Sequence, residues 1–175
     1  MALSRPRLAT PDPHAYPTWE SRVATEADVR WLAPRLAVAA LDEIEAMSKF
    51  QPISALLMDL PAKLVVSDNR RPTQPDAILY IHPDDGQPTA GFWCAVTERL
   101  AQSEWVWSFT SYVTPILDHF NSLHPTLHTL VDARNGGQME LVERLGFKHF
   151  ISAPFGRREM PFHFYKRNVA PCAIQ

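Results

Sequence analysis

Residues 131–147, VDARNGGQMELVERLGF, constrain the fold more than any other part of this chain. The apolar residues Leu127, Leu130 and Val131 lead into the segment and are typical of a buried strand. The turn around Asn135 breaks this strand, and apolar residues then recur at helical spacing. Gly146 stands where a helix commonly ends in a left-handed residue. The segment therefore predicts a strand, an Asn-bearing turn and a short helix, followed by a strand at residues 148–154.

Asn135 and the Leu145-Gly146-Phe147 ending resemble, at the same spacing, the C-terminal half of the GNAT superfamily of acyl-CoA-dependent N-acyltransferases. The alternative is an ordinary helix cap in some other α/β domain. The resemblance implies an α/β (α+β) fold with a mixed sheet, two N-terminal helices and splayed fourth and fifth strands. It also implies acetyl-CoA as the cofactor, held in the gap between those two strands.

Shorter pieces resemble one branch of that superfamily, a phage-encoded group of internal virion or core proteins. They are residues 24–29 (ATEADV), 32–36 (LAPRL), 42–44 (DEI) and 131–135 (VDARN). The resemblance to this branch covers most of residues 22–167 as short pieces. It implies a host or phage protein as partner, and a location in the host cytoplasm or in the virion.

Composition limits the classes of function. A chain of 175 residues can form one domain with its own core. The net charge of −2 gives no basic excess, which nucleic acid or an anionic membrane would favour, and no apolar run approaches membrane-span length. Six glycines against sixteen prolines disfavour a glycine-rich phosphate loop. Cys94 and Cys172 form no CxxC motif, so we expect a reducing, cytosolic compartment.

We expect three regions along the chain: a proline-rich N-terminal arm at residues 1–21, a GNAT-like domain at residues 22–167 and a tail at residues 168–175. The arm packs on the domain or a partner through Tyr16 and Trp19, or it is a loose tail. A strand at residues 22–24 opens the domain.

Two N-terminal helices follow that strand in the prediction. Thr25 and Asp28 predict a capping box at the start of a helix that Pro34 kinks or breaks. Residues 54–60 predict a further short helix. Residues 77–81 and 89–96 predict a hairpin, joined by a Pro-Asp-Asp-Gly turn.

Residues 103–109, SEWVWSF, alternate aromatic with smaller or polar side chains, which predicts a half-buried fourth strand. Thr114 and Pro115 then predict the start of a helix. Residues 110–114 become the loop at which family members bind the pyrophosphate of the cofactor. This loop contains no glycine and no basic residue, so we expect weakened acyl-CoA binding. The resemblance assigns cofactor contacts to Trp107, Phe109, Thr110, Ser111, Thr114 and Asn135.

Catalytic candidates are few. The resemblance places Glu104 on the predicted strand and Glu98 before it as general bases, with a solvated charge at the strand edge as the favoured alternative for either. Many family members carry a tyrosine as general acid where this chain has Val142, which cannot transfer a proton. Tyr112 is the substitute acid, with a packed tyrosine as the alternative. Asp132 is expected to pair with a neighbouring arginine.

Metal and hydrolase chemistry are not indicated. His119, His124 and His128 are close in sequence, but Pro125 keeps them off one helix face, and no spacing fits a zinc site. No G-x-S-x-G motif occurs. Two functions remain: a phage protein that binds a host or phage protein, with weak or absent acyl transfer, or an active acetyl-CoA-dependent N-acetyltransferase that modifies a host protein or a small-molecule amine.

Overall fold

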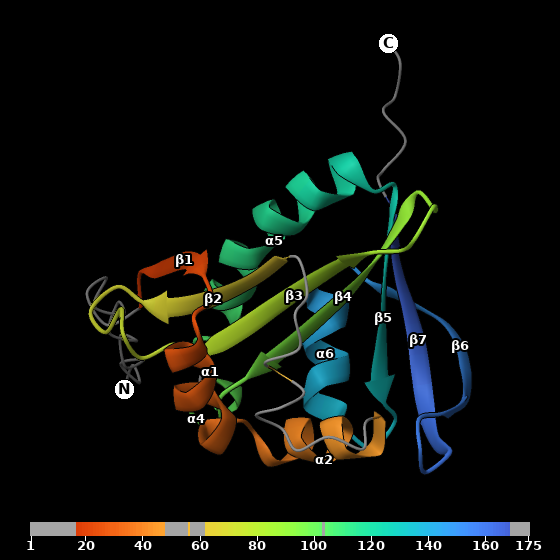
Figure 1. The fold of residues 1–175 in the computed structure, drawn as a ribbon, viewed down its shortest axis with the longest axis horizontal. Coiled ribbons are helices and arrows are strands. Elements are labelled where there is room, and N and C mark those ends of the chain that lie inside the picture. The colour runs from red at the N-terminus through yellow and green to blue at the C-terminus, as the bar shows by residue number, and fades with distance from the viewer. Residues whose placement is uncertain (1–16, 48–55, 57–61, 103, 169–175) are drawn as a thin grey trace, which may run out of the picture.

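The computed structural model describes residues 17–47, 56, 62–102 and 104–168, which form a seven-stranded sheet with helices on both faces (Figure 1). The N-terminal half contains β1 (Trp19–Val23), α1 (Glu26–Leu32), η1 (Ala33–Arg35), α2 (Val38–Met47), β2 (Ala62–Asp68), β3 (Ala77–Pro83) and β4 (Thr89–Val96). The C-terminal half contains α4 (Glu98–Ala101), α5 (Val106–Leu123), β5 (Thr126–Asp132), α6 (Gly136–Arg144), β6 (Lys148–Phe155) and β7 (Met160–Asn168).

The strand order is β1-β2-β3-β4-β5-β7-β6, and every pairing is antiparallel except that of β4 with β5. Those two central strands pair only from Thr89 with Thr126 to Gly91 with His128. Beyond that point they diverge toward α2, which gives the sheet a V-shaped opening in its middle (Figure 1). The predicted α/β fold with splayed fourth and fifth strands is confirmed, with β4 at residues 89–96.

The sheet separates two hydrophobic cores because successive strand residues face opposite sides. On β3, Ile78 packs with α1 and α2, whereas Leu79 packs with α5 and α6. The α1–α2 region begins with the predicted Thr25–Asp28 capping box. The break at Pro34 is also confirmed, because a short 3₁₀ turn separates α1 from α2 there.

The prediction of a strand at residues 103–109 and a loop at 110–114 is wrong: residues 104–105 form a turn, and residues 106–114 form the first turns of α5. The buried residues Phe109, Val113 and Leu117 recur at helical spacing, while Trp107 is 62% exposed. The short aromatic alternation at residues 105–109 is therefore the N-terminal end of a longer pattern with helical spacing. Pro115 lies inside the helix, where it removes one backbone donor.

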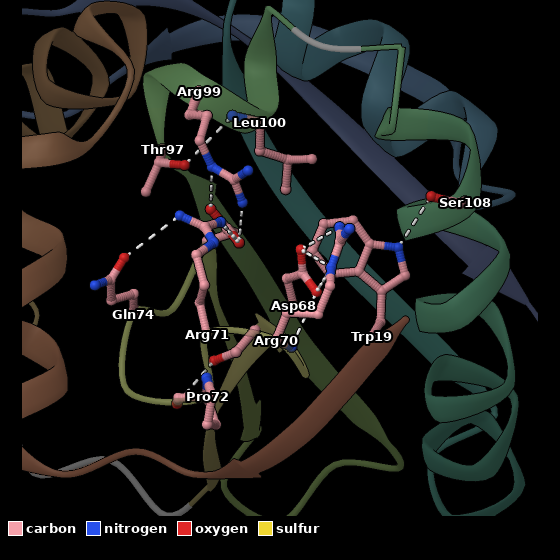
Figure 2. Close-up of polar contacts among 12 residues, drawn as sticks. Trp19, Asp68, Arg70, Arg71, Pro72, Gln74, Thr97, Arg99, Leu100 and Ser108 are labelled. Carbon is pink, nitrogen blue, oxygen red and sulfur yellow. Dashed lines mark hydrogen bonds and ion pairs between the residues drawn. The ribbon is translucent and has the colours of Figure 1, made fainter. Parts of the chain in front are cut away.

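The sheet starts earlier than predicted, at Trp19 in place of Arg22. The Trp19 indole is 8% exposed, meets Phe109 edge to face at 5.6 Å and donates from Nε1 to Ser108 Oγ at 3.0 Å (Figure 2). Trp19 therefore joins β1 to α5 as part of the core. Of the predicted helix at 54–60 only Leu56 is described, and residues 1–16 of the arm and 169–175 of the tail lie outside the described residues.

The C-terminal unit follows the prediction closely. Asn135 caps α6 by accepting from the Gln138 amide, and Gly146 ends the helix with a φ of +88°. Phe147 is buried and stacks on Phe92 of β4. The helix is thereby packed against the central strands, with its N-terminus at the open end of the V.

Candidate active site

Helix α2 lies across the open end of the V, where β4 and β5 no longer pair (Figure 1). The Ala37 amide before the helix donates to the Val96 carbonyl at the end of β4, at 3.0 Å. On the other side, the Asp132 amide at the end of β5 donates to Glu43 Oε2 at 3.1 Å. Helix α2 thus satisfies backbone groups of both diverging strands, and it inserts one carboxylate between them.

That carboxylate, Glu43, is only 2% exposed. Its Oε1 accepts a hydrogen bond from Trp93 Nε1 and its Oε2 one from Asn135 Nδ2, each at 3.3 Å. Burial raises the pKa of Glu43 to about 7, and the charge of Asp132 acts in the same direction, whereas the three hydrogen bonds lower it. A carboxylate with a pKa near neutrality can both take up and release a proton under physiological conditions.

The sequence analysis missed Glu43, although a signal was present. Glu43 shares the apolar stripe of α2 with Ala40, Ile44 and Met47, at spacings that place all four on one helix face. An acid on the buried face of a helix needs partners. Trp93, Asp132 and Asn135 supply them from segments distant in sequence.

Gln138 makes a second connection across the gap. Its Nε2 donates to the Cys94 carbonyl of β4 at 2.8 Å, from the first turn of α6. The Cys94 thiol is also buried here, and burial raises its pKa far above its usual range. Cys94 therefore remains a protonated core residue and is not a nucleophile.

A groove of about 440 Å³ opens beside these residues, and we call it the helix-end groove. The helix N-termini that border it include α5 at Val106 and α6 at Gly136 and Gly137, and the charged residues Asp42, Glu98 and Arg134 line it as well. A Cβ added at either glycine would meet no atom within 4 Å, so the backbone there is open to a ligand. Helix N-termini carry partial positive charge and attract anions, and two of them here border one groove.

A second cavity of about 280 Å³ lies on the α2 face of the sheet, and we call it the apolar pocket. Ile44 and Met47 of α2 cover it, and Trp93 of β4 and Leu130 of β5 form its floor. Ala40 and Asp42, from the preceding turn of α2, line the helix-end groove. Glu43 therefore lies between the groove and the pocket, with the Trp93 indole on its pocket side.

The structure places most of the predicted site residues away from the gap. Glu104 is exposed in the turn before α5, and Phe109 is buried in the core. The hydroxyls of Thr110, Ser111 and Thr114 donate to carbonyls of their own helix. No phosphate-binding loop exists at these residues, because they are helical.

The remaining predicted residues divide into two groups. Trp107 is exposed on α5 under the Arg144 guanidinium, and Tyr112 donates to Ser21 Oγ at 3.0 Å. Neither of these side chains borders the helix-end groove. Asn135 does border the groove and also contacts Glu43. Glu98 lines the same groove and accepts from the Val38 amide at 3.3 Å, so these two predicted residues lie at the gap.

Asp132 pairs with Arg134 as expected, with Arg134 Nε donating to Oδ1 at 2.9 Å. This hydrogen bond lowers the pKa of Asp132, which stays ionised next to Glu43. Within the described residues, no three side chains of His, Cys, Asp or Glu gather as metal ligands. None of the helices in that same part of the chain has the length and apolar character needed to cross a membrane.

Solved acetyltransferase structures share this architecture. A spermidine N-acetyltransferase from Vibrio cholerae, in complex with CoA and spermine, aligns with a TM-score of 0.64 and 10% identity over 86% of this chain and 95% of that chain. An acetyltransferase of the GNAT family from Bacillus anthracis gives a TM-score of 0.64 and 9% identity over 86% and 94%. The ribosomal-protein-S5-alanine acetyltransferase from Vibrio fischeri gives 0.60 and 11% over 86% and 92%.

No family model matches the sequence, and no curated protein matches it. The likeness to the solved structures extends over nearly their whole length, at identities that carry information about the fold alone. The chain therefore has the fold of the GNAT acetyltransferases.

Proposed function

We propose that this protein binds an acyl-CoA and transfers its acyl group to an amine, with Glu43 as the general base. The observation that carries the proposal is the position of Glu43. A buried carboxylate with a pKa of about 7 lies at the opening of the splayed strands, next to a groove that two helix N-termini border.

The residues of the helix-end groove fit a CoA thioester. The amides at Gly136 and Gly137 and the first turn of α5 at Val106 would hold its phosphates, because helix N-termini stabilise anions. The pantetheine arm would lie in the V between β4 and β5. When bound, the thioester supplies an activated acyl carbon at which the amine nitrogen replaces sulfur, and the electron pair of the carbon–sulfur bond leaves with the thiolate.

Glu43 makes the amine nucleophilic. An ammonium group has no lone pair, so one proton must leave before attack. Because Glu43 borders neither cavity and Trp93 holds its Oε1, the proton reaches the carboxylate through one water. The nitrogen loses a second proton after attack, and the sulfur gains one from solvent, since Val142 at the family's acid position cannot donate.

We also propose that CoA binds more weakly than in an enzyme with a glycine-rich phosphate loop. The reason is no longer the sequence of residues 110–114, which are helical, but that of the segment before α5. The segment between β4 and α5, residues 97–105, also contains no glycine. Its Arg99 is held by Asp76, with Nε donating to Oδ1 at 2.9 Å, and its guanidinium faces the Trp105 ring. Losing one charge-assisted contact of about 1.5–3 kcal/mol lowers affinity roughly ten- to a hundredfold.

One pair of variants tests the binding site. Gly137→Asp places a carboxylate at the α6 N-terminus, where it suits the helix dipole but repels phosphate. Gly137→Asn has nearly the same shape without the charge. Calorimetry with CoA is expected to show at least tenfold weaker binding to the Asp variant than to the Asn variant. Equal CoA affinity of the two variants would remove the helix-end groove from the proposal.

A second pair tests the base. Glu43→Gln is expected to lower kcat by roughly 10²–10⁴ while CoA affinity is kept, because it removes the proton acceptor. The amide oxygen can still accept from the Asp132 amide and Asn135, whereas the acceptor for Trp93 Nε1 is lost. Glu45→Gln is the matched control, since Glu45 lies on the same helix but is exposed and paired with Arg158. CoA release with an amine acceptor is the readout. A Glu43→Gln protein as active as the control would exclude Glu43 as the base.

A second function, binding of a host or phage protein, is supported by strand β6. This edge strand is exposed along almost its entire length, including Phe150 at 63% and Ile151 at 51%. Exposed apolar residues on a sheet edge favour pairing with another chain. Replacing Ile151 with Lys is expected to abolish capture of a partner from phage-infected cells, whereas Gly137→Asp is expected to leave it intact. Partner capture that survives Ile151→Lys would place the contact elsewhere.

A further inference from the structure

We propose that the apolar pocket binds the acceptor, and that this acceptor is an apolar primary monoamine with one hydrogen-bond-accepting group, not a polyamine. The inference rests on the proposed function and specifies its substrate. The pocket lies on the opposite side of Glu43 from the helix-end groove. An amine in the pocket and a thioester in the groove would therefore approach the same carboxylate from two sides.

The walls of the pocket indicate an apolar body for the ligand. Its volume of about 280 Å³ is at the lower end for small-molecule sites. The side chains of Ile44, Met47, Ile78, Trp93 and Leu130 enclose most of it. A small aromatic or branched aliphatic group would remove this surface from water and gain the hydrophobic contribution.

The charges of the described residues around the pocket disfavour several ammonium groups. None of the described residues that line it is an acid, and its basic or imidazole side chains are Lys63, His82 and His128. His128 in turn pairs with Asp84 at 2.8 Å, so that carboxylate is already engaged. Each additional ammonium of a polyamine would be buried without an anionic partner, at a substantial cost. The Glu43 carboxylate can serve as the anionic partner of one ammonium group.

Among the polar residues that line the pocket, Tyr80 offers a buried hydroxyl without a partner. Its hydroxyl is buried and, alone among the buried side-chain polar atoms of the described residues, has no hydrogen-bond partner. Tyr80 lines the pocket from β3, directly across from Trp93 in the strand register. Burial raises the pKa of Tyr80 to about 12, so the hydroxyl keeps its proton and can donate to a ligand oxygen.

Calorimetry on the full chain without any acyl-CoA tests the pocket separately from turnover. The probes are tyramine, which has a phenolic oxygen, phenethylamine, which lacks it, and spermidine. Tyramine is expected to bind at least tenfold more tightly than spermidine, and roughly two- to tenfold more tightly than phenethylamine, the value of one hydrogen bond. Spermidine binding as tightly as tyramine would overturn the proposal.

Tyr80→Phe is expected to reduce tyramine affinity to that of phenethylamine and to leave phenethylamine binding unchanged. Tyr112→Phe is the matched control, because that hydroxyl contacts Ser21 outside the pocket. An unchanged preference for tyramine in Tyr80→Phe would contradict the assignment. Octanoyl-CoA that competes with tyramine while CoA does not would also overturn it, since the pocket would then hold an acyl chain.

The two proposals fail in different ways. If the chain binds tyramine through Tyr80 but neither binds CoA nor transfers an acyl group, the pocket is an amine site and the proposed acyl transfer is wrong. If it transfers acetyl to spermidine and tyramine does not bind, the acyl transfer stands and the acceptor class is wrong.

Discussion

Glu43 shows how the surroundings of one side chain change its chemistry. Almost complete burial favours its protonated form, and the neighbouring Asp132 carboxylate adds to this effect. Three donors stabilise the ionised form and limit the rise of the pKa to about 7. The same balance that allows Glu43 to exchange protons near neutral pH also makes it a source of instability at higher pH.

Stability is therefore expected to fall with pH through the range in which Glu43 ionises. Its folded-state pKa of about 7 lies above the ordinary value of 4.5, so between these values the folded state binds the extra proton. The stability that this proton provides is present below pH 4.5 and is lost as pH rises through 7. The loss is about 1.4 kcal/mol per pH unit, or about 3 kcal/mol in all.

Urea unfolding of wild type and Glu43→Gln at pH 5, 6, 7 and 8 measures this effect as the difference between two curves. The unfolding free energy of wild type minus that of Glu43→Gln is expected to decrease as pH rises, and to level off above pH 7. Glu45→Gln should follow the wild type throughout. Parallel curves for wild type and Glu43→Gln would mean that Glu43 is ionised in the folded state from low pH.

Gly156 in the β6–β7 turn is expected to be intolerant of any side chain. Its φ is +74°, and an added Cβ would lie 2.4 Å from the Ala46 carbonyl oxygen at the end of α2. Gly156→Ala should therefore cost at least about 2 kcal/mol of unfolding free energy. Gly86→Ala is the matched control, since φ is +67° there but no atom lies within 4 Å. Equal losses in the two variants would show that only backbone strain matters.

At the scale of elements, β1 and α5 depend on each other. Strand β1 is the outermost strand on its side and pairs only with β2 among the described strands. The Trp19 side chain fixes it to α5 by packing on Phe109 and donating to Ser108. One aromatic residue, in a segment that the sequence analysis assigned to an arm, therefore attaches the first described strand to the core.

A chain that begins at Arg22 is expected to be less stable than one that begins at Pro17, because it lacks Trp19. Removal of a buried Trp side chain costs about 3–5 kcal/mol. For a domain of this size, that corresponds to a melting temperature lower by roughly 6–20 °C. Calorimetry on both chains, and on Trp19→Ala in the full chain, gives the comparison. Similar melting temperatures for all three would show that Trp19 is not part of the folding core.

At the scale of the whole molecule, the sheet consists of two halves that share three residue pairs between β4 and β5. Other contacts must hold the halves together beyond that point. Helix α2 bridges them through Ala37 and Glu43, and α6 bridges them through Gln138. The V can remain open for a ligand because these side chains and helices, and not strand pairing, connect the halves.

Gln138→Met is expected to weaken that connection while it preserves side-chain volume. The Cys94 carbonyl loses a donor in a buried position, which costs about 1–3 kcal/mol of unfolding free energy. Gln102→Met is the control, because the Gln102 amide contacts Glu98 on the exposed surface. Chemical unfolding compares the two. A Gln138→Met protein as stable as the control would show that this hydrogen bond contributes nothing net.

The sequence by itself determined the parts whose contacts are local. The Thr25–Asp28 capping box, the break at Pro34 and the unit from Asn135 to Gly146 depend on residues a few positions apart. Their side chains therefore specify the backbone without reference to the rest of the fold. The same unit carried the resemblance from which the fold class was predicted.

Features that depend on packing between distant residues could be decided only by the tertiary structure. Residues 103–109 alternate over too short a span to distinguish strand from helix, and burial of Phe109 against Trp19 and the sheet settles the outcome. Glu43 could not be identified from the sequence as a proton acceptor, because its partners Trp93, Asp132 and Asn135 lie 50 to 92 residues away. A pKa depends on the burial and charges around a group, and these arise only when α2 crosses the gap between β4 and β5.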